Sequence, residues 1–497
     1  MNRRLIWILL AAFILPLLVR FVWFFPGFQF PRTVATPNYA AATMPQAPVS
    51  TRPALEVRSE PGLVLLDYAH SNQYQTNEIQ SLTDAVAERA GRVEVNSDST
   101  ALATELKAAS AYVVISPSIA FTADEILQIE DFVNRGGRLA VFTDATRGLT
   151  SYDFMGNPVG SMADVNTVNP LLDNFGITVN ADYLYNLVEN EGNFRNVYLT
   201  PFARSDLNSG LSKVAFYGTH SLETDGGLAV LVGSDKTLSS STDALPSVAS
   251  AASGTSSGQG WAAAVVNKDQ NVFAAGDFTF LMPPYDTVAD NATLISHIAD
   301  FLLGGNRKPT LADYPYVFKG TDVSLLPTSD IQMTADMTGA ISRLQSGLAS
   351  SGTKLDVAQD APSEGDLIVL GTFSPADDLN KYVDPFNITL DDSSEFIKAP
   401  QFGKFGQSGN GLLLFKLGDK GNTLVLLADT EDDVTTLMDT LGSGNLSGCV
   451  LQGDMGLCSI GTGGSFSVET PVPEATLSTG ETSSPSLNVP ATATPSG

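Results

Sequence analysis

The most constraining feature of the sequence is a regular alternation of short apolar runs and amphipathic segments between residues 61 and 144. Four apolar runs have the length of strands: GLVLLDYAH, RVEVN, AYVVISP and RLAVFTD. Two of the segments between them, TNEIQSLTDAVAERAG and FTADEILQIEDFVNRGG, carry apolar residues at helical spacing and end at glycines. Such alternation builds right-handed βαβ units. It predicts an α/β fold with a doubly wound, mostly parallel sheet.

The alternation continues less regularly to the end of a first predicted domain, residues 61–305. Four further strands and one amphipathic helix are expected there: KVAFYG, GLAVLVG, WAAAVVN, NVFAAGD and VADNATLISHIADFLLGG. A second, smaller α/β domain is predicted over residues 306–462. Its strand patterns are YVFKG, DVSLLP, DLIVLGT, GLLLFKLGD and NTLVLLADT. With 497 residues the chain is long enough for roughly two to three domains.

The N-terminus carries an apolar segment, Leu5–Phe25, directly after the pair Arg3 and Arg4. A membrane span needs about 20 apolar residues, and flanking arginines mark the cytoplasmic side. We therefore predict that residues 1–30 form a transmembrane signal anchor. The chain would then be a single-pass protein of the cell membrane, with its bulk extracytoplasmic. A cleaved signal peptide is the alternative, because residues 39–42 form a small-residue stretch, although it lies far beyond the apolar segment.

Three segments are poor in apolar periodicity. Residues 31–60 are rich in proline and small residues and predict an extended linker. Residues 463–497 are rich in Ser, Thr and Pro and predict a disordered tail. Residues 237–260 have a similar composition but lie between strand patterns, so we expect a mobile loop there.

The charge of the chain excludes two classes of partner. There are 54 acidic and 27 basic residues, which gives a formal net charge of −27. A field of this sign repels nucleic acid and anionic lipid headgroups. We therefore expect no nucleic-acid partner, and contact with the membrane only through the N-terminal helix.

The two cysteines, Cys449 and Cys458, lie close together in GCVLQGDMGLC. Outside the cytoplasm such a pair predicts a hairpin-like disulfide, with free thiols as the alternative. No histidine or second cysteine pair stands nearby, and the three histidines of the chain form no HExxH motif. Phosphate-binding glycine loops followed by a helix are also missing. We therefore expect no metal and no cofactor.

Part of the chain resembles a known family. The stretch DYAHSN, followed by a helix and then by AYVVISPSIAFTADEILQIEDFVNRGGRLAVFTD, resembles the bacterial domain-of-unknown-function family 4350. Those domains look like class I glutamine amidotransferases in topology. GDFTFLMPPYDTVADNATLISHIADFLLGG is similar to the closing strand and helix of gliding-motility-type ABC-transporter auxiliary proteins. The resemblance covers residues 61–305 and implies an amidotransferase- or flavodoxin-like sheet and a partner among ABC-transporter or envelope proteins.

The nucleophile of the amidotransferases has no counterpart in this sequence. In that arrangement a cysteine follows the strand after the GG-terminated helix, but RLAVFTDATRG has Thr143 or Asp144 there. A carboxylate cannot act through the thiolate route, and no His-x-Glu pair follows. Glutamine amidotransfer is therefore excluded, and we predict that the chain is not an enzyme.

Polar residues follow several of the predicted strands, where parallel sheets bind ligands. We expect five of them to converge on one solvent-exposed rim as tentative ligand-binding residues: Asp67, His70, Asn72, Asp144 and Asp277. The alternative is that they are caps and loop residues. A Ser–His–Asp set built from Ser116 or Ser118 is disfavoured, because G-x-S-x-G is absent.

These observations favour a membrane-anchored, extracytoplasmic, non-enzymatic binding or accessory protein that serves a membrane transporter or an envelope assembly. Two alternatives remain open. One is a cell-envelope hydrolase that uses the His70/Asp144/Asp277 rim. The other is a structural surface stalk, suggested by the linker, the tail and the acidity.

Overall fold

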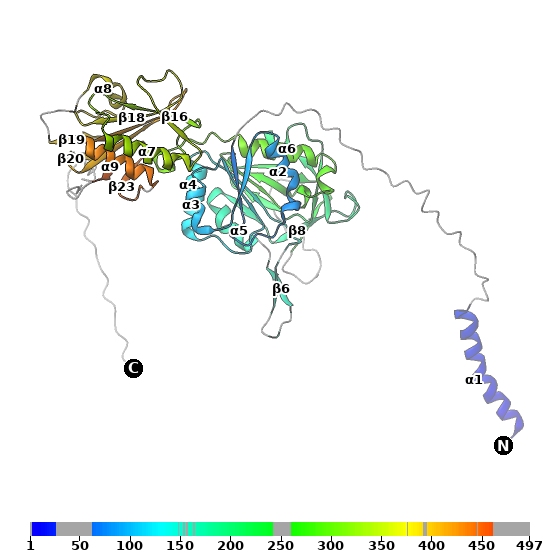
Figure 1. The fold of residues 1–497 in the computed structure, drawn as a ribbon. Coiled ribbons are helices and arrows are strands. Elements are labelled where there is room, and N and C mark those ends of the chain that lie inside the picture. The colour runs from blue at the N-terminus through cyan, green and yellow to red at the C-terminus, as the bar shows by residue number, and fades with distance from the viewer. Residues whose placement is uncertain are drawn as a thin grey trace, which may run out of the picture. The chain divides into compact units, whose positions relative to one another are not determined.

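The computed structural model describes residues 2–25, 62–147, 149–152, 155, 158–162, 165–241, 260–374, 376–390, 395–444 and 446–460. The predicted linker, the predicted tail and most of the predicted loop at 237–260 lie outside these ranges. The chain divides into two compact units, Met1–Thr51 and Arg52–Gly497. Figure 1 shows the elements of both units as a ribbon.

The described part of the first unit is the 22-residue helix α1 (Arg3–Phe24) with one residue on either side. An 18-residue window within it has a mean hydropathy of 2.6, and none of its residues is buried. Among the described residues it is the one helix that is long and apolar enough to cross a membrane, a property that anchors and signal sequences share.

The second unit begins with a nine-stranded sheet in the order β10-β9-β12-β14-β15-β4-β3-β1-β2. Its strands are β1 (Leu63–Asp67), β2 (Arg92–Asn96), β3 (Ala111–Ile115), β4 (Arg138–Phe142), β9 (Asn196–Pro201), β10 (Val214–Tyr217), β12 (Leu228–Gly233), β14 (Ala262–Val266) and β15 (Val272–Ala275). The five strands from β2 to β15 are parallel to one another. Only β14 and β9 run in the opposite direction to the other seven. The prediction of a large, mostly parallel sheet in an α/β fold is confirmed.

Helices cover both faces of this sheet (Figure 1). One face carries α2 (Gln80–Ala87) and α6 (Asn291–Leu303), and the other carries α3 (Leu102–Glu105), α4 (Ala123–Asn134) and α5 (Val165–Leu172). Successive residues of a strand point to opposite faces. In β1, Val64 and Leu66 accordingly pack in the α2/α6 layer, whereas Leu65 packs in the α4/α5 layer. Burial on both faces explains why the strand sequences are apolar throughout.

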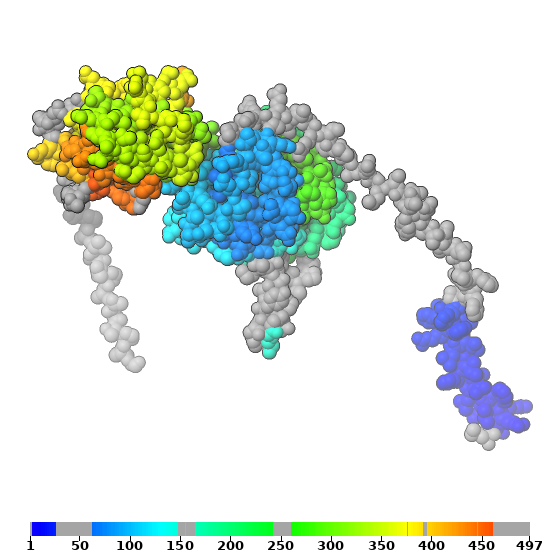
Figure 2. All heavy atoms as spheres, in the orientation of Figure 1, coloured from blue at the N-terminus to red at the C-terminus, as the bar shows by residue number. Residues whose placement is uncertain are grey.

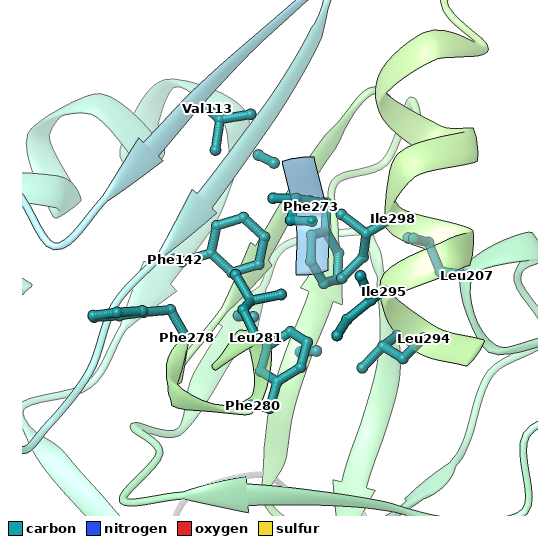
Figure 3. Close-up of a cluster of buried hydrophobic side chains, with 14 of the residues drawn as sticks. Val113, Phe142, Leu207, Phe273, Phe278, Phe280, Leu281, Leu294, Ile295 and Ile298 are labelled. Carbon is teal, nitrogen blue, oxygen red and sulfur yellow. The ribbon is translucent and has the colours of Figure 1, made fainter. Parts of the chain in front are cut away.

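The α6 layer has an aromatic centre. Figure 3 shows Phe142 of β4 and Phe273 of β15 directed toward Ile295 and Ile298 of α6. The two phenylalanine rings meet edge to face, with their centroids 5.8 Å apart. Each fully buried side chain of this size stabilises the fold by about 1.5–3 kcal/mol.

The start of α4 matters for the site described below. Thr122 caps the helix, and its hydroxyl accepts a hydrogen bond from the Glu125 backbone N–H. The Glu125 carboxylate accepts in return from the Thr122 backbone N–H at 2.7 Å. This reciprocal pair is the capping box expected from T-x-x-E before an apolar run. It holds the Glu125 side chain at the amino end of the helix.

A seven-stranded sheet follows, in the order β17-β16-β18-β22-β21-β24-β23. Its strands are β16 (Asp322–Pro327), β17 (Lys354–Val357), β18 (Asp366–Thr372), β21 (Asn410–Lys416), β22 (Thr423–Ala428), β23 (Cys449–Gln452) and β24 (Met455–Ser459). α7 (Ala335–Ala349) and α9 (Glu431–Gly442) pack on one face. α8 (Asp377–Val383) and the hairpin of β19 (Phe396–Ala399) and β20 (Gly403–Gly406) pack on the other. The structure joins Cys449 to Cys458 in a disulfide across the β23–β24 hairpin.

The remaining described elements are short. Three further pairs of strands are β5 (Leu149–Tyr152) with β6 (Pro158–Met162), β7 (Ile177–Val179) with β11 (Leu222–Thr224), and β8 (Asp182–Tyr185) with β13 (Leu238–Ser241). The 3-10 helices are η2 (Thr76–Glu78), η3 (Ser99–Ala101), η4 (Asp173–Phe175), η5 (Asp206–Asn208), η6 (Thr279–Leu281), η7 (Tyr285–Thr287), η8 (Leu311–Asp313) and η9 (Asp384–Phe386).

Two sequence predictions about local structure are wrong. YVFKG forms turns and not a strand, and Val317 within it is fully buried against the second sheet without pairing to it. The segment at 237–260 does not begin as a loop, because Leu238–Ser241 pairs with β8. In both cases a tertiary contact decides the conformation of a short segment whose own pattern is weak.

The predicted boundary between residues 305 and 306 is bridged by a buried ion-pair group. Asp313 is 1% exposed and accepts hydrogen bonds from Arg135 at 2.6 Å and from Arg307 at 2.5 Å. Arg135 follows α4 and Arg307 follows α6, so one carboxylate ties the start of the second sheet region to two helices of the first. The exact domain boundaries stay predictions.

Candidate functional site

The five predicted rim residues lie at or just after the carboxyl ends of β1, β4 and β15, as expected, but all five are buried. The exposed fractions are 0% for Asp67, 2% for His70, 6% for Asn72, and 0% for Asp144 and Asp277. The prediction that they form a solvent-exposed rim is therefore wrong. The loops after the strands fold back over the strand ends and supply hydrogen-bond partners to these groups, as buried polar groups require.

His70 is the centre of the first cluster. Its Nδ1 lies 3.0 Å from Asp67 Oδ1, and its Nε2 lies 3.5 Å from Glu125 Oε1. The imidazole ring stacks on Phe121, with 3.7 Å between the ring centroids. The capping box of α4 therefore positions one carboxylate and the end of β1 positions the other. We call Asp67, His70 and Glu125 the histidine cluster.

Electrostatics favour the charged form of this histidine. Burial by itself lowers the pKa of His70, but the hydrogen bond and negative charge of Asp67, together with the charge of Glu125, outweigh it, so the pKa is raised above 6.5. The pKa of Glu125 is lowered in spite of burial, because Thr122 and His70 stabilise its ionised form. Tyr112 stands on the same face as Asp67, and burial and the Asp67 charge raise its pKa well above the ordinary value. The cluster is a histidine held between two carboxylates, both of which favour its protonated form.

The loop after β1 is tied to the end of β3. Asn72 Nδ2 donates to the Ile115 carbonyl at 2.9 Å, and the Gln73 backbone N–H donates to the Ser116 carbonyl at 2.9 Å. The hydroxyl of Ser118 donates to the Ser71 carbonyl at 2.8 Å. These are the contacts of turn residues, as the alternative interpretation expected.

Asp144 and Asp277 form a second cluster around Thr279. Asp144 accepts from the Thr279 hydroxyl at 2.7 Å and from the Thr146 backbone N–H at 2.8 Å. Asp277 accepts from the backbone N–H groups of Thr279 and Tyr217, both at 2.8 Å. Burial, and then the nearby charge of Asp144, raises the pKa of Asp277 well above its ordinary range. We call Asp144, Asp277 and Thr279 the aspartate cluster.

The two clusters lie on opposite faces of the nine-stranded sheet. His70 contacts Phe121, which packs in the α4/α5 layer, whereas the aspartate cluster lies beside Phe280, which packs in the α2/α6 layer. The predicted convergence on one rim is therefore wrong. The strand register explains it, because Asp67 shares the face of Leu65, while Asp144 and Asp277 share the face of Phe142 and Ala275.

Several members of the clusters are absent from the sequence prediction. Glu125, Tyr112, Phe121 and Thr279 are not among the predicted site residues. The signal that could have identified Tyr112 is a lone phenol in an otherwise aliphatic central strand. Nothing in the local sequence indicates that Glu125 meets His70, because 55 positions separate them and only the tertiary fold brings them together.

The arrangement has restricted chemistry. Both nitrogens of His70 face carboxylates, and its side chain is 3% exposed, so the ring is not placed to take a proton from a substrate in this conformation. Within the described ranges, no group of three or more His, Cys, Asp or Glu side chains could hold a metal ion. What the histidine cluster does is fasten the loop after β1 to the start of α4.

One comparison with known proteins finds a match to a transport-system family over part of the chain. Residues 60–197 match a family model described as an ABC-type uncharacterized transport system. This match supports the likeness to transporter auxiliary proteins, whereas the likenesses to family 4350 and to the amidotransferases stay predictions. No curated protein matches the chain.

Solved structures show only a distant similarity. The mmIFT52 N-terminal domain is 14% identical, covers 49% of this chain and 98% of its own, and has a TM-score of 0.36. A putative ThuA-like protein from Bacteroides uniformis is 11% identical, covers 50% and 92%, and has a TM-score of 0.30. Another from Parabacteroides merdae is 8% identical, covers 49% and 90%, and has a TM-score of 0.27. Similarity at this level assigns no function to the chain.

Proposed function

We propose that this protein is a membrane-tethered, extracytoplasmic and non-enzymatic accessory protein of an ABC-type transport system. The observation that carries the proposal is the match of residues 60–197 to the transport-system family model. The matched residues include strands β1 to β4 and all three members of the histidine cluster. α1 supports the tether, since its length and hydropathy suit a membrane span.

The histidine and aspartate clusters support the non-enzymatic part of the proposal. An active site needs a reactive group that a substrate can reach. Here the polar side chains after β1, β4 and β15 are buried and engaged with one another or with the backbone. We also propose that the first sheet has an amidotransferase-like topology. In it, Thr143 or Asp144 would stand at the position of the catalytic cysteine.

The association is tested by affinity purification of the full chain from native membranes in a mild detergent. We expect an ABC ATPase and a permease to co-purify in a fixed ratio. A variant in which α1 is replaced by an unrelated membrane span is the control, and it should still capture both proteins if the extracytoplasmic part makes the contact. Recovery of the chain without either protein, with or without prior cross-linking, would contradict the proposal.

The non-enzymatic part is tested separately with the purified chain. Amide, ester and glycoside substrates should show no turnover above the buffer rate. If hydrolysis is observed and is lost in a His70→Asn or Asp144→Asn variant that circular dichroism shows to be folded, the envelope-hydrolase alternative replaces the proposal.

A further inference from the structure

A cavity of about 640 Å³ lies beside the edge of the nine-stranded sheet, between β2 and α2. This volume falls in the range of small-molecule sites, about 300–1,000 Å³. Its floor consists of Leu66, Tyr74 and Ile79, which are almost fully buried. The residues that line it all fall between 66 and 95, in the blue part of the surface in Figure 2.

The lining combines apolar surface with neutral polar groups. Val93 and Val95 of β2 form one wall, and Gln75, Thr76 and Thr83 contribute an amide and two hydroxyls. None of the nine described residues that line the cavity is charged, in a chain with 81 acidic and basic residues (54 + 27). A charged ligand would lose its hydration without gaining an opposite charge, so the lining selects for neutral molecules.

Tyr68 provides a flat aromatic surface at the cavity. Its side chain is 51% exposed, and its ring meets the ring of Tyr74 edge to face at 5.8 Å. Tyr74 is itself fixed, because its hydroxyl donates to the Asp67 carbonyl at 3.1 Å. An exposed ring that packs against a fixed neighbour can stack on the apolar C–H face of a ligand ring.

The edge of β2 adds main-chain hydrogen-bonding groups. The Arg92 N–H donates to Gly62, and the Asn96 carbonyl accepts from Tyr68, so residues 92 and 96 face β1. Alternation then directs the N–H and C=O groups of Val93 and Val95 away from β1. In the described part of the chain no strand pairs with this side of β2.

From these features we propose that the cavity is a binding site for a neutral saccharide of one or two rings. A sugar ring has an apolar face that stacks on Tyr68 and a hydroxyl-bearing edge that pairs with the Thr76 hydroxyl, the Gln75 amide NH₂ and the edge of β2. The Thr83 hydroxyl already donates to the Gln80 carbonyl at 2.9 Å, and the Gln75 side-chain oxygen accepts from the Glu78 backbone N–H, so Thr83 offers a ligand only an acceptor. A hydrocarbon would leave the Thr76 hydroxyl and the main-chain groups at the edge of β2 without partners. An extended peptide would pair with the main-chain groups at the edge of β2. It would not pair with the polar side chains that η2 and α2 place over the face of the sheet. The site does not depend on the transport role proposed above.

The test measures binding of cellobiose, maltose, trehalose and N,N′-diacetylchitobiose to the full chain in nanodiscs, because alkyl-glycoside detergents would compete. Titration calorimetry and saturation-transfer NMR should show saturable binding of at least one disaccharide in the millimolar range. Tyr68→Ala should weaken it about tenfold, and Thr76→Val, which replaces the hydroxyl with a methyl group of similar size, about threefold. Tyr68→Phe should retain it. Tyr316→Ala removes another exposed tyrosine, 40% exposed and remote in sequence, and should leave binding unchanged.

Three results would overturn the proposal. They are no binding by any of the four sugars, unchanged affinity in both Tyr68→Ala and Thr76→Val, and binding of an uncharged apolar peptide that the sugars do not displace. The Thr76 variant keeps the test decisive if Tyr68→Ala fails to fold, which circular dichroism would reveal. Loss of sugar binding leaves the co-purification experiment unaffected, so the two proposals fail independently.

Discussion

Replacement of His70 by Gln should destabilise the first sheet region strongly, and more at acidic than at alkaline pH. His70 and Asp67 form a pair whose side chains are 3% and 0% exposed. Removal of one partner of a buried ion pair costs about 3–5 kcal/mol, because the remaining charge has no compensation. An exposed loop residue would cost only about 0.5 kcal/mol, so the buried position of His70 raises the expected cost several-fold.

The pH dependence follows from the raised pKa of His70. A group with a folded-state pKa above its unfolded value of 6.5 stabilises the fold fully below pH 6.5. That stabilisation is lost as the pH rises through the folded-state pKa. The groups that face the ring are Asp67 and Glu125. This pair of carboxylates therefore sets both the size and the direction of the pH dependence of stability.

The assay is thermal unfolding of the full chain, followed by circular dichroism at several pH values. For a region of this size about 3 kcal/mol corresponds to a decrease in Tm of about 6–12 °C. The double-mutant cycle with Asp67→Asn isolates the coupling energy of the pair. His297→Gln, which removes a single hydrogen bond to the Leu207 carbonyl, is the matched control and should cost about 1 kcal/mol.

The reasoning is refuted if His70→Gln lowers Tm by no more than His297→Gln, or if its effect grows as the pH rises. Either result would mean that the ring is not held as a cation between the two carboxylates.

The other predictions concern separate parts of the chain. Asp313→Ala should destabilise it by about 3–5 kcal/mol, since two arginines lose a buried partner, and limited proteolysis should then separate the two sheet regions. Asp277→Asn should cost about 1–3 kcal/mol in a melting experiment, because the amide NH₂ would face a backbone N–H donor. Non-reducing peptide mapping should find Cys449 linked to Cys458, and reduction should cost about 2–3 kcal/mol while the first sheet region keeps its Tm. If α1 is a retained anchor, the chain should resist carbonate extraction and be digested by external protease; a soluble, shortened product would support cleavage instead.

Much of the architecture follows from the sequence alone, because it depends on local rules. The alternation of apolar strands with capped amphipathic helices specifies a parallel sheet covered on both faces. The Thr122–Glu125 capping box and the apolar helix at Arg3–Phe24 likewise need only neighbouring residues. The conformations of YVFKG and Leu238–Ser241 could not be predicted from the sequence, because contacts with distant residues outweigh the weak local patterns there.

The site depended on the tertiary structure. Sequence placed Asp67, His70, Asp144 and Asp277 after the correct strands, but a strand end does not reveal which face a side chain takes or whether the next loop covers it. Register and loop closure decided both, and they separated the histidine cluster from the aspartate cluster. The meeting of His70 with Glu125 likewise requires that β1 and α4 pack against each other. Sequence patterns report the periodicity of burial, whereas pairing of distant polar groups is a property of the folded chain alone.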